Sequence, residues 1–262
     1  MFKISIVGAG NVAYRMALFL QQAGHCVECV CARNIEKAEK VVRALKRGRS
    51  NAFATSDYNQ LPVSDITIIA VSDNAIGNVA SQLPHKDSFT VHTSGATPMT
   101  VLKEAGLNNV GVFYPLMTLS MHKELDIRLI PYLIEADSQQ GTDTLKELVN
   151  SIKAEYKICD SAQRLKFHTA AIFTTNFLNY SLSLAYDIAS PDFVLLLPSA
   201  IESIRKAFLN TPAVSQTGPA KRGDTNTIEK HLQVLQDEKF AEHLEVYRFL
   251  TEKIFKRYNP DK

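Results

Sequence analysis

The fold class follows from one stretch near the N-terminus, Phe2-Lys3-Ile4-Ser5-Ile6-Val7-Gly8-Ala9-Gly10-Asn11-Val12-Ala13. Its apolar first half predicts a strand, its glycines a tight turn, and the apolar periodicity from Val12 to Ala23 a helix. Gly8 allows the sharp turn, Gly10 lets backbone amides approach a pyrophosphate, and Ala13 keeps the helix close to the sheet. The order strand, turn, helix is typical of a dinucleotide-binding motif, in which the anion lies at the helix N-terminus. We therefore expect Gly8, Ala9, Gly10, Asn11 and Val12 to bind a cofactor.

The type of dinucleotide is predicted from the end of the second expected strand, Cys26 to Ala32. In NAD sites a carboxylate about 20 residues past the glycines accepts a hydrogen bond from the ribose 2′-hydroxyl. This chain has Arg33 and Asn34 at that place and no carboxylate before Glu36. Because a guanidinium pairs well with a 2′-phosphate, we expect NADP. The alternative is that Arg33 is solvated and that Asn34 only caps the next helix, Ile35 to Arg47.

Short strands and helices alternate up to Asp160, which predicts a doubly wound sheet. The apolar run from Asp65 to Val71 is typical of a central parallel strand buried on both faces. We expect Val71, Ser72 and Asp73 at its end to lie beside the glycine turn, where doubly wound folds bind ligands. Ser94 follows the next strand, Phe89 to Thr93, and is expected on the loop nearest the nicotinamide.

After Asp160 the pattern changes to helices alone, which predicts two domains. The first is an α/β Rossmann-type domain over residues 1–160, and the second is an all-α domain over residues 161–262. The expected helices of the second domain are Ser161 to Ala189, Asp192 to Leu209 with a kink or restart at Pro198, Asp224 to Gln236, and Lys239 to Tyr258, with a loop from Asn210 to Gly223. Apolar runs such as Phe193-Val194-Leu195-Leu196-Leu197 exceed what about 100 residues can bury, so we expect a homodimer through this half.

A polar stripe is expected on the first helix of the second half. At 3.6 residues per turn Arg164, His168, Thr175 and Asn179 share one face, with Asn176 at its edge. Such a stripe indicates a cavity or an interface, and plain solvent exposure is the alternative. His168 alone in the stripe titrates near neutrality, so it is the candidate proton donor, although a lone histidine is more often structural. Asn176 is the candidate for orienting a substrate.

The loop from Gln216 to Asp224 is a second polar cluster, with two glycines, one proline and the pair Lys221-Arg222. It is either a plain helix connection or an anion clamp. In the second case Arg222 and the amides at the next helix start hold a carboxylate or phosphate of a small-molecule substrate.

Composition excludes several classes of protein. The net charge of +2 over 262 residues gives no sign of a nucleic-acid partner, and the basic cluster Lys46-Arg47-Gly48-Arg49 is interpreted as an exposed helix end. No apolar run reaches the roughly 20 residues of a membrane span, and no signal peptide is visible, so we expect a cytoplasmic protein. Cys26 and Cys29 should point to opposite faces of a strand, which argues against a metal site and for reduced, buried thiols.

Together these segments resemble a known group of enzymes. The first half, through Gly8-Ala9-Gly10-Asn11-Val12-Ala13, Arg33-Asn34, Ala70-Val71-Ser72-Asp73 and His92-Thr93-Ser94-Gly95-Ala96, resembles the NADP-binding domain of the pyrroline-5-carboxylate reductase and 6-phosphogluconate dehydrogenase superfamily. The second half is similar to uncharacterised Rossmann-like NADP oxidoreductases through Tyr114-Pro115-Leu116, His168-Thr169-Ala170-Ala171 with Asn176, and Thr217-Gly218-Pro219 with Arg222-Gly223-Asp224. The resemblance covers nearly the whole chain. It implies NADP, a helical second domain that pairs in a homodimer, and a cofactor cleft between the domains.

Two departures from the characterised relatives leave the substrate open. Phe173-Thr174-Thr175-Asn176 stands where pyrroline-5-carboxylate reductases have Gly-Ser-Gly-Pro, and Ala170 stands where 3-hydroxyacid dehydrogenases have the asparagine of a Lys-x-x-x-Asn pair. The sequence thus predicts an NADP-dependent oxidoreductase that moves a hydride between the nicotinamide and a small carbonyl or imine carbon. The candidate catalytic residues are His168, Asn176, Ser94 and Arg222. A non-catalytic NADP-binding sensor is the alternative.

Overall fold

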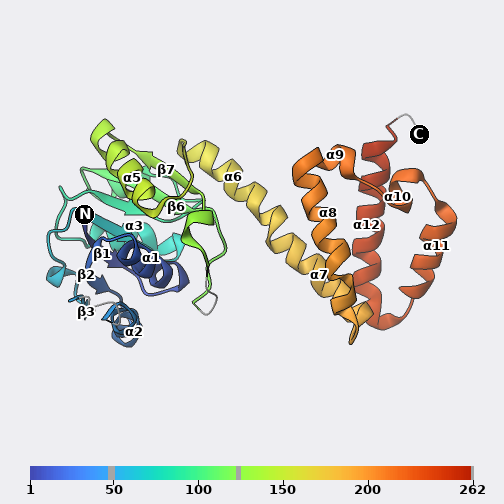
Figure 1. Ribbon diagram of the computed structural model, residues 1–262, viewed down its shortest axis with the longest axis horizontal. Coiled ribbons are helices and arrows are strands. Elements are labelled where there is room, and N and C mark those ends of the chain that lie inside the picture. The colour runs from blue at the N-terminus through green and yellow to red at the C-terminus, as the bar shows by residue number, and fades with distance from the viewer. Residues whose placement is uncertain (47–50, 122–124, 261–262) are drawn as a thin grey trace. The chain divides into compact units, whose positions relative to one another are not determined.

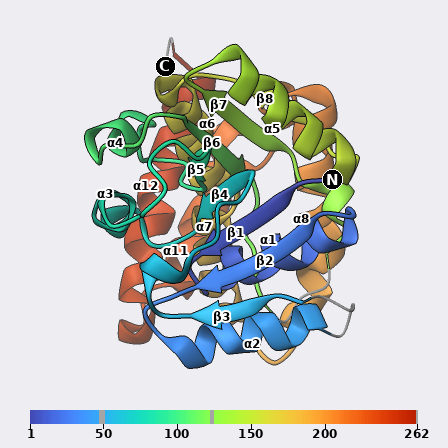
Figure 2. The ribbon, with the colours of Figure 1, turned by 90° about the vertical axis from the view of Figure 1, so that its left-hand side faces the viewer.

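The first half of the chain is built on one eight-stranded sheet. The computed structural model describes residues 1–46, 51–121 and 125–260. The strands lie in the order β3-β2-β1-β4-β5-β6-β7-β8, and the pairings are parallel except that of β6 with β7 (part of the sheet is labelled in Figure 1, all eight strands in Figure 2). Their bounds are β1 Lys3–Val7, β2 Cys26–Cys31, β3 Phe53–Thr55, β4 Ile66–Ile69, β5 Thr90–His92, β6 Val110–Pro115, β7 Tyr132–Ala136 and β8 Tyr156–Ile158. The strand order reverses between β1 and β4, which is where such sheets open a crevice at their carboxyl edge.

Helices cover both faces of this sheet, and each face has its own apolar core. On one face lie α1 Asn11–Gln22, α2 Ile35–Lys46 and α5 Gln139–Ile152, and on the other α3 Ile76–Ser81 and α4 Thr100–Glu104 (Figure 2). All four residues of β4 are buried, as expected for a central parallel strand. The predicted doubly wound α/β fold, followed by helices alone, is confirmed.

Some element boundaries differ from the prediction. Helix α5 begins at Gln139 rather than Thr142, because Ser138 Oγ accepts a hydrogen bond from Gly141 N at 3.0 Å. Helix α3 was not predicted, since its six residues are too short for a periodic pattern. The helix expected to reach Arg47 is described only to Lys46, and most of the basic cluster lies outside the described residues.

The long helix expected from Ser161 to Ala189 is divided into α6 Ser161–Thr174 and α7 Asn176–Ala189. The hydroxyls of Thr174 and Thr175 both donate to the carbonyl of Ala171, at 3.1 and 2.7 Å. This local bonding competes with the regular helical pattern.

The chain forms two compact units, Met1–Asn176 and Phe177–Lys262. The division after Asn176 places α6 with the sheet. The sequence pattern predicts that the cofactor-binding domain ends at residue 160, and that boundary stays a prediction. Within residues 1–46, 51–121 and 125–260, none of the helices combines the length and the hydropathy that a membrane span requires.

The second unit contains short and long helices without a large core. Its helices after α7 are α8 Leu197–Asn210, α9 Pro212–Ser215, α10 Pro219–Arg222, α11 Thr225–Val234 and α12 Ala241–Tyr258 (Figure 1). The predicted loop from Asn210 to Gly223 is therefore partly helical. Pro198 lies in the first turn of α8, which agrees with a restart, and Asp224 caps α11 by accepting from Thr227 N at 3.1 Å.

The cysteines of the described chain are free thiols. Cys29, Cys31 and Cys159 are buried as predicted, but Cys26 is exposed, because it opens β2 at the edge of the core. Burial raises the pKa of Cys29 to about 12 and that of Cys31 to about 11, so both stay protonated at neutral pH.

Candidate active site

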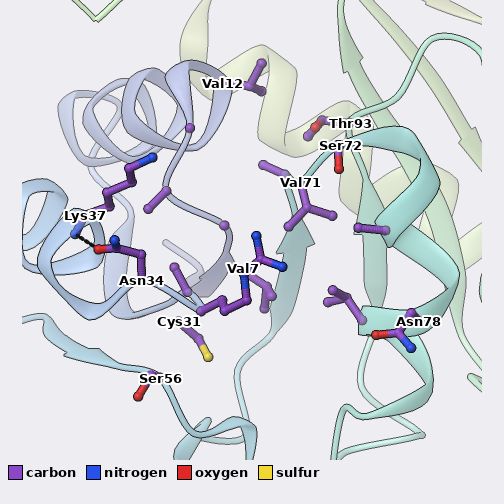
Figure 3. Close-up of a pocket in the computed structure, with 18 of the residues that line it drawn as sticks. Val7, Val12, Cys31, Asn34, Lys37, Ser56, Val71, Ser72, Asn78 and Thr93 are labelled. Carbon is purple, nitrogen blue, oxygen red and sulfur yellow. Dashed lines mark hydrogen bonds between the residues drawn. The ribbon is translucent and has the colours of Figure 1, made fainter.

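A pocket of about 990 Å³ opens at the carboxyl edge of β1, β2 and β4. Its wall brings together all ten residues that the sequence predicts for the cofactor: Gly8, Ala9, Gly10, Asn11, Val12, Arg33, Asn34, Val71, Ser72 and Asp73. In Figure 3, Asn34 and Lys37 lie on one side of the pocket, and Ser72 and Thr93 lie on the other. The pocket therefore spans the point where the strand order reverses, where doubly wound sheets bind dinucleotides.

The glycine turn has the backbone geometry that a dinucleotide site needs. Gly8 has a φ of +125°, and a Cβ there would lie 2.2 Å from the carbonyl oxygen of Ala70. Gly8 N donates to the carbonyl of Cys31 at 2.8 Å, so the turn is bonded to the end of β2. A Cβ on Gly10 would meet no protein atom within 4 Å, because this residue faces open space at the N-terminus of α1. That space and the unpaired amides of the first helical turn fit a pyrophosphate.

The β2 side of the pocket carries two cations. Arg33 and Lys37 are exposed, and in the described part of the chain neither has an ion-pair partner. Asn34 Oδ1 accepts from Lys37 N at 3.0 Å and so caps α2, as the simpler interpretation of this residue predicted. This cap does not exclude binding, because Asn34 also lines the pocket. Two unneutralised cations beside a capped helix start fit the 2′-phosphate of NADP.

On the other side of the pocket, the loop after β5 is held by Ser94. Its Oγ accepts from Ala96 N at 3.1 Å and Thr97 N at 2.9 Å, and it bonds Thr97 Oγ1 at 3.0 Å. Ser94 N donates to His92 Nδ1 at 3.1 Å. Burial, helped by the positive charge of Arg164, lowers the pKa of His92 to about 3, so this imidazole stays neutral. The hydroxyl of Ser94 is thus committed to the shape of the loop.

A tyrosine–histidine pair lies next to this loop. Tyr114 Oη and His168 Nδ1 are 2.9 Å apart and hydrogen-bonded, and both side chains belong to the first compact unit. The pair packs directly on this loop at Gly95, where a Cβ would lie 2.6 Å from His168 Nδ1 and 2.8 Å from Tyr114 Cζ. The predicted proton donor His168 therefore has a phenolic partner, which the sequence did not reveal.

Helix α6, which carries His168, is fixed to the sheet by Arg164. This side chain is buried and forms an ion pair with Glu135 of β7. It also donates to the carbonyl of Thr97 at 2.6 Å and to Ser161 Oγ at 3.2 Å. At Arg164 the polar stripe expected on α6 is therefore buried and not solvent-exposed, and this side chain anchors the helix to the sheet.

The other two predicted catalytic residues, Asn176 and Arg222, do not line the pocket. Asn176 is exposed and accepts from Thr175 Oγ1 at 2.8 Å through its Oδ1. Arg222 belongs to the second compact unit, where its guanidinium lies 3.8 Å from the Asp224 carboxylate. Their expected roles in orienting a substrate and clamping an anion stay predictions.

Sequence reasoning missed other residues of the pocket wall, among them Lys37, Ser56, Tyr58, Asn78, Gln82 and Thr93. The sequence contained enough information to predict two of these residues, Lys37 and Thr93. Lys37 lies in the first turn of the predicted helix α2, and Thr93 immediately precedes the loop that was expected at this edge.

The comparisons with known proteins agree with this geometry. Residues 3–94 match the family described as "NADP oxidoreductase coenzyme F420-dependent", and residues 130–254 match a domain of unknown function, DUF2520. The crystal structure of a Bacteroides fragilis protein provisionally named an NADP oxidoreductase is 31% identical, with a TM-score of 0.86 over 97% of this chain and 98% of that chain. The chain belongs to the NADP oxidoreductase family. Its cofactor is NADP.

Two further structures share the fold of this oxidoreductase at low identity. A reductive aminase from Aspergillus terreus, in complex with NADPH and ethyl-5-oxohexanoate, has a TM-score of 0.71 at 14% identity, over 98% of this chain and 94% of that one. A pyrroline carboxylate reductase from Plasmodium falciparum, with NADP bound, has a TM-score of 0.61 at 11% identity, over 97% and 98%. A search of curated protein sequences gave no significant match. The fold is thus shared over nearly the whole chain.

Proposed function

We propose that this oxidoreductase transfers a hydride between NADPH and the carbon of a small carbonyl or imine substrate. The observation that carries the proposal is the hydrogen-bonded pair of Tyr114 and His168, an acid group beside the loop that follows the pocket residue Thr93. Hydride addition leaves negative charge on the heteroatom, so a positioned acid speeds the reaction. The imine reductase and the reductive aminase of Aspergillus terreus, which have the same fold, support this substrate class.

Each part of the pocket has a proposed task in holding NADP. The backbone of Gly8, Ala9, Gly10, Asn11 and Val12 binds the pyrophosphate; Arg33, Asn34 and Lys37 bind the 2′-phosphate; and Val71, Ser72 and Asp73 form the wall on the nicotinamide side. The cofactor supplies the hydride, while the protein orients it and provides the proton. Ser94 shapes the loop next to the reacting groups through the hydrogen bonds of its Oγ.

The test is a search for turnover. Purified protein with NADPH is screened against fractions of a metabolite extract, oxidation is followed by the loss of nicotinamide absorbance, and the consumed compound is identified by mass spectrometry. The expected result is a fraction whose carbonyl or imine compound gains two hydrogens. If NADPH binds tightly but no fraction is reduced by enzyme at micromolar concentration, the catalytic proposal is wrong and a binding protein is the better account.

Replacing Arg33 with alanine should lower the affinity for NADPH at least tenfold and leave that for NADH nearly unchanged. The reason is that a charge-assisted hydrogen bond to the 2′-phosphate is worth about 1.5–3 kcal/mol. Calorimetry with both cofactors measures the change. Arg43→Ala is the matched control, because Arg43 is also exposed, on α2, but pairs with Glu39 outside the pocket. An equal loss for NADH and NADPH would contradict the 2′-phosphate role.

We also propose that the protein is a homodimer through its second unit. Among the described residues of this unit the buried ones are Ala220, Leu235 and His243. Large apolar side chains are exposed instead, namely Phe177, Tyr186, Ile188, Val194, Leu195, Leu196, Leu197, Ile201, Ile204, Phe208, Leu209, Val214, Val234, Phe249 and Leu250. An apolar surface of this size is typical of a subunit interface.

Light scattering on a sizing column should therefore give twice the mass of 29.1 kDa. Leu195→Lys and Phe208→Glu, at side chains 74% and 77% exposed, should shift the mass toward that of a single chain. Leu129→Lys is the control, since Leu129 is 73% exposed in the first unit. A single-chain mass for the unaltered protein at micromolar concentration would refute the proposal.

A cytoplasmic location is part of the same proposal. The cysteines of the described chain are free, and Cys29 and Cys31 lie on one strand without forming a disulfide. Free thiols persist in reducing compartments, which agrees with an enzyme that uses cytoplasmic NADPH.

A further inference from the structure

The pair of Tyr114 and His168 combines two side chains that are 54 residues apart in the sequence. Their rings meet edge to face, with centroids 5.8 Å apart and an interplanar angle of 75°. Both side chains are half-buried, and both pack on the Cα of Gly95, where no side chain intervenes. The contact between the two rings and their contact with Gly95 therefore fix the hydrogen bond between Tyr114 Oη and His168 Nδ1, as expected for a positioned acid.

Strand register places Tyr114 at the carboxyl edge of the sheet. His92 of β5 pairs with Val112 of β6, so Tyr114 lies beside the residues that follow His92. The first of these, Thr93, lines the pocket. Tyr114 and His168 are not residues of the pocket wall, and the strand register places Tyr114 next to the loop that begins at Thr93.

A charge in the pocket wall affects the pKa of the Tyr114 phenol. Burial and, after it, the negative charge of Asp73 raise the pKa of Tyr114, while Arg164 opposes the change. Asp73 lines the same pocket as Thr93. The hydroxyl of Tyr114 is thus protonated at neutral pH and within electrostatic reach of the proposed nicotinamide side.

We propose that Tyr114 is the catalytic acid and that His168 is the residue that positions and reprotonates it. The proposal rests on the function proposed above and names the atom that delivers the proton. His168 Nδ1 is bonded to the phenol, so this ring nitrogen is directed at Tyr114 and not at a substrate. When His168 Nδ1–H donates to Tyr114 Oη, the phenolic proton is left free to point at a substrate heteroatom.

The proton balance is simple. As the hydride of NADPH adds to the carbonyl or imine carbon, the O–H bond of Tyr114 breaks and an O–H or N–H bond forms on the substrate. The phenolate then takes the Nδ1 proton of His168 while Nε2 of the same ring takes a proton from solvent, so the imidazole loses one proton and gains one in the same relay. The sum is substrate, NADPH and one proton in, and reduced substrate and NADP⁺ out.

The first experiment needs no substrate. Protein labelled with ¹³Cζ-tyrosine is titrated by NMR from pH 8 up to the alkaline limit of the folded protein, near pH 12, with NADP⁺ and with NADPH bound, and the Tyr114 signal is assigned by its loss in Tyr114→Phe. NADP⁺ carries one more positive charge, on the nicotinamide ring. A hydroxyl that faces this ring should titrate about one pH unit lower with NADP⁺ than with NADPH. Equal behaviour of Tyr114 in the two complexes overturns the proposal.

The second experiment measures turnover with NADPH, using a five-membered cyclic imine, a keto ester with methylamine, and any compound found in the extract screen. Tyr114→Phe should lower kcat at least about 100-fold with the Kd for NADPH unchanged, and His168→Ala about tenfold. His168→Ala should also move the alkaline limb of the pH profile, which a merely structural role would not do. Tyr156→Phe, on edge strand β8, is the control and should keep full activity.

The outcomes separate the two proposals. Turnover by the unaltered enzyme that survives in Tyr114→Phe within about twofold overturns the role of Tyr114 and leaves the oxidoreductase function intact. No turnover with any compound overturns the function, and the proton delivery with it.

Discussion

Replacing Arg164 with methionine should lower the free energy of unfolding of the first compact unit by about 3–5 kcal/mol, the typical cost of removing one partner of a buried ion pair. The Arg164 side chain is 1% exposed and its partner Glu135 is 14% exposed. Methionine fills a similar volume, but it leaves the Glu135 carboxylate facing a buried, unpaired environment. It also leaves the carbonyl of Thr97 without its donor.

The measurement must allow for two units that need not unfold together. Hydrogen exchange of the β7 amides reports the local free energy of opening in the first unit. Arg43→Met is the matched control, because the exposed pair of Arg43 and Glu39 on α2 is worth at most about 1 kcal/mol. Combining Arg164→Met with Glu135→Leu should recover most of the loss, since no charge is then left unpaired. A loss in Arg164→Met no larger than that in Arg43→Met would contradict the anchoring role.

The anchor matters for function because His168 lies one helical turn beyond Arg164 on α6. Ser161, at the start of the same helix, donates to Glu135 and accepts from Met99 N at 3.0 Å. One buried network thus joins α6, β7 and the loop before α4. It holds His168 against Tyr114, so loss of the network should reduce turnover as well as stability.

The cofactor pocket could be predicted from sequence because its signals are local. The turn at Gly8 depends on the residues around it, and Arg33 follows β2 directly, so counting along the chain placed both at one sheet edge. The central strand Ile66–Ile69 brought Ser72 and Asp73 there by the same rule. Each prediction needed only a strand end and the parallel topology.

The reacting groups could not be predicted in this way because their contacts are long-range. The bond between Tyr114 and His168 depends on the register of β6 against β5 and on the buried ion pair of Arg164 with Glu135. Helical periodicity correctly placed Arg164 and His168 on one face. It failed beyond Thr175, where threonine hydroxyls that bond the Ala171 carbonyl divide the helix.

Gly8→Ala should destabilise the first unit by about 3 kcal/mol or more and lower the affinity for NADPH at least about 100-fold. At a φ of +125° an alanine is strained, and its Cβ would lie 2.2 Å from the Ala70 carbonyl oxygen. The Ala70 amide is itself bonded to Val7 O at 2.7 Å, so the backbone of β1 and β4 must separate to make room. The glycine turn would move with it, and with the turn the proposed pyrophosphate site.

Gly10→Ala is the matched test of why the second glycine is needed. Its φ of −80° suits alanine, and a Cβ there meets no protein atom within 4 Å, so the stability should change by less than about 1 kcal/mol. The new methyl group would project into the pocket space assigned to the pyrophosphate, so the affinity for NADPH should still fall at least tenfold. Denaturation and calorimetry of the two variants together decide the matter. Without a ligand, the Cβ of an alanine at position 10 would contact no other part of the protein. If Gly10→Ala binds NADPH as tightly as the unaltered protein, the pyrophosphate therefore does not lie at this turn.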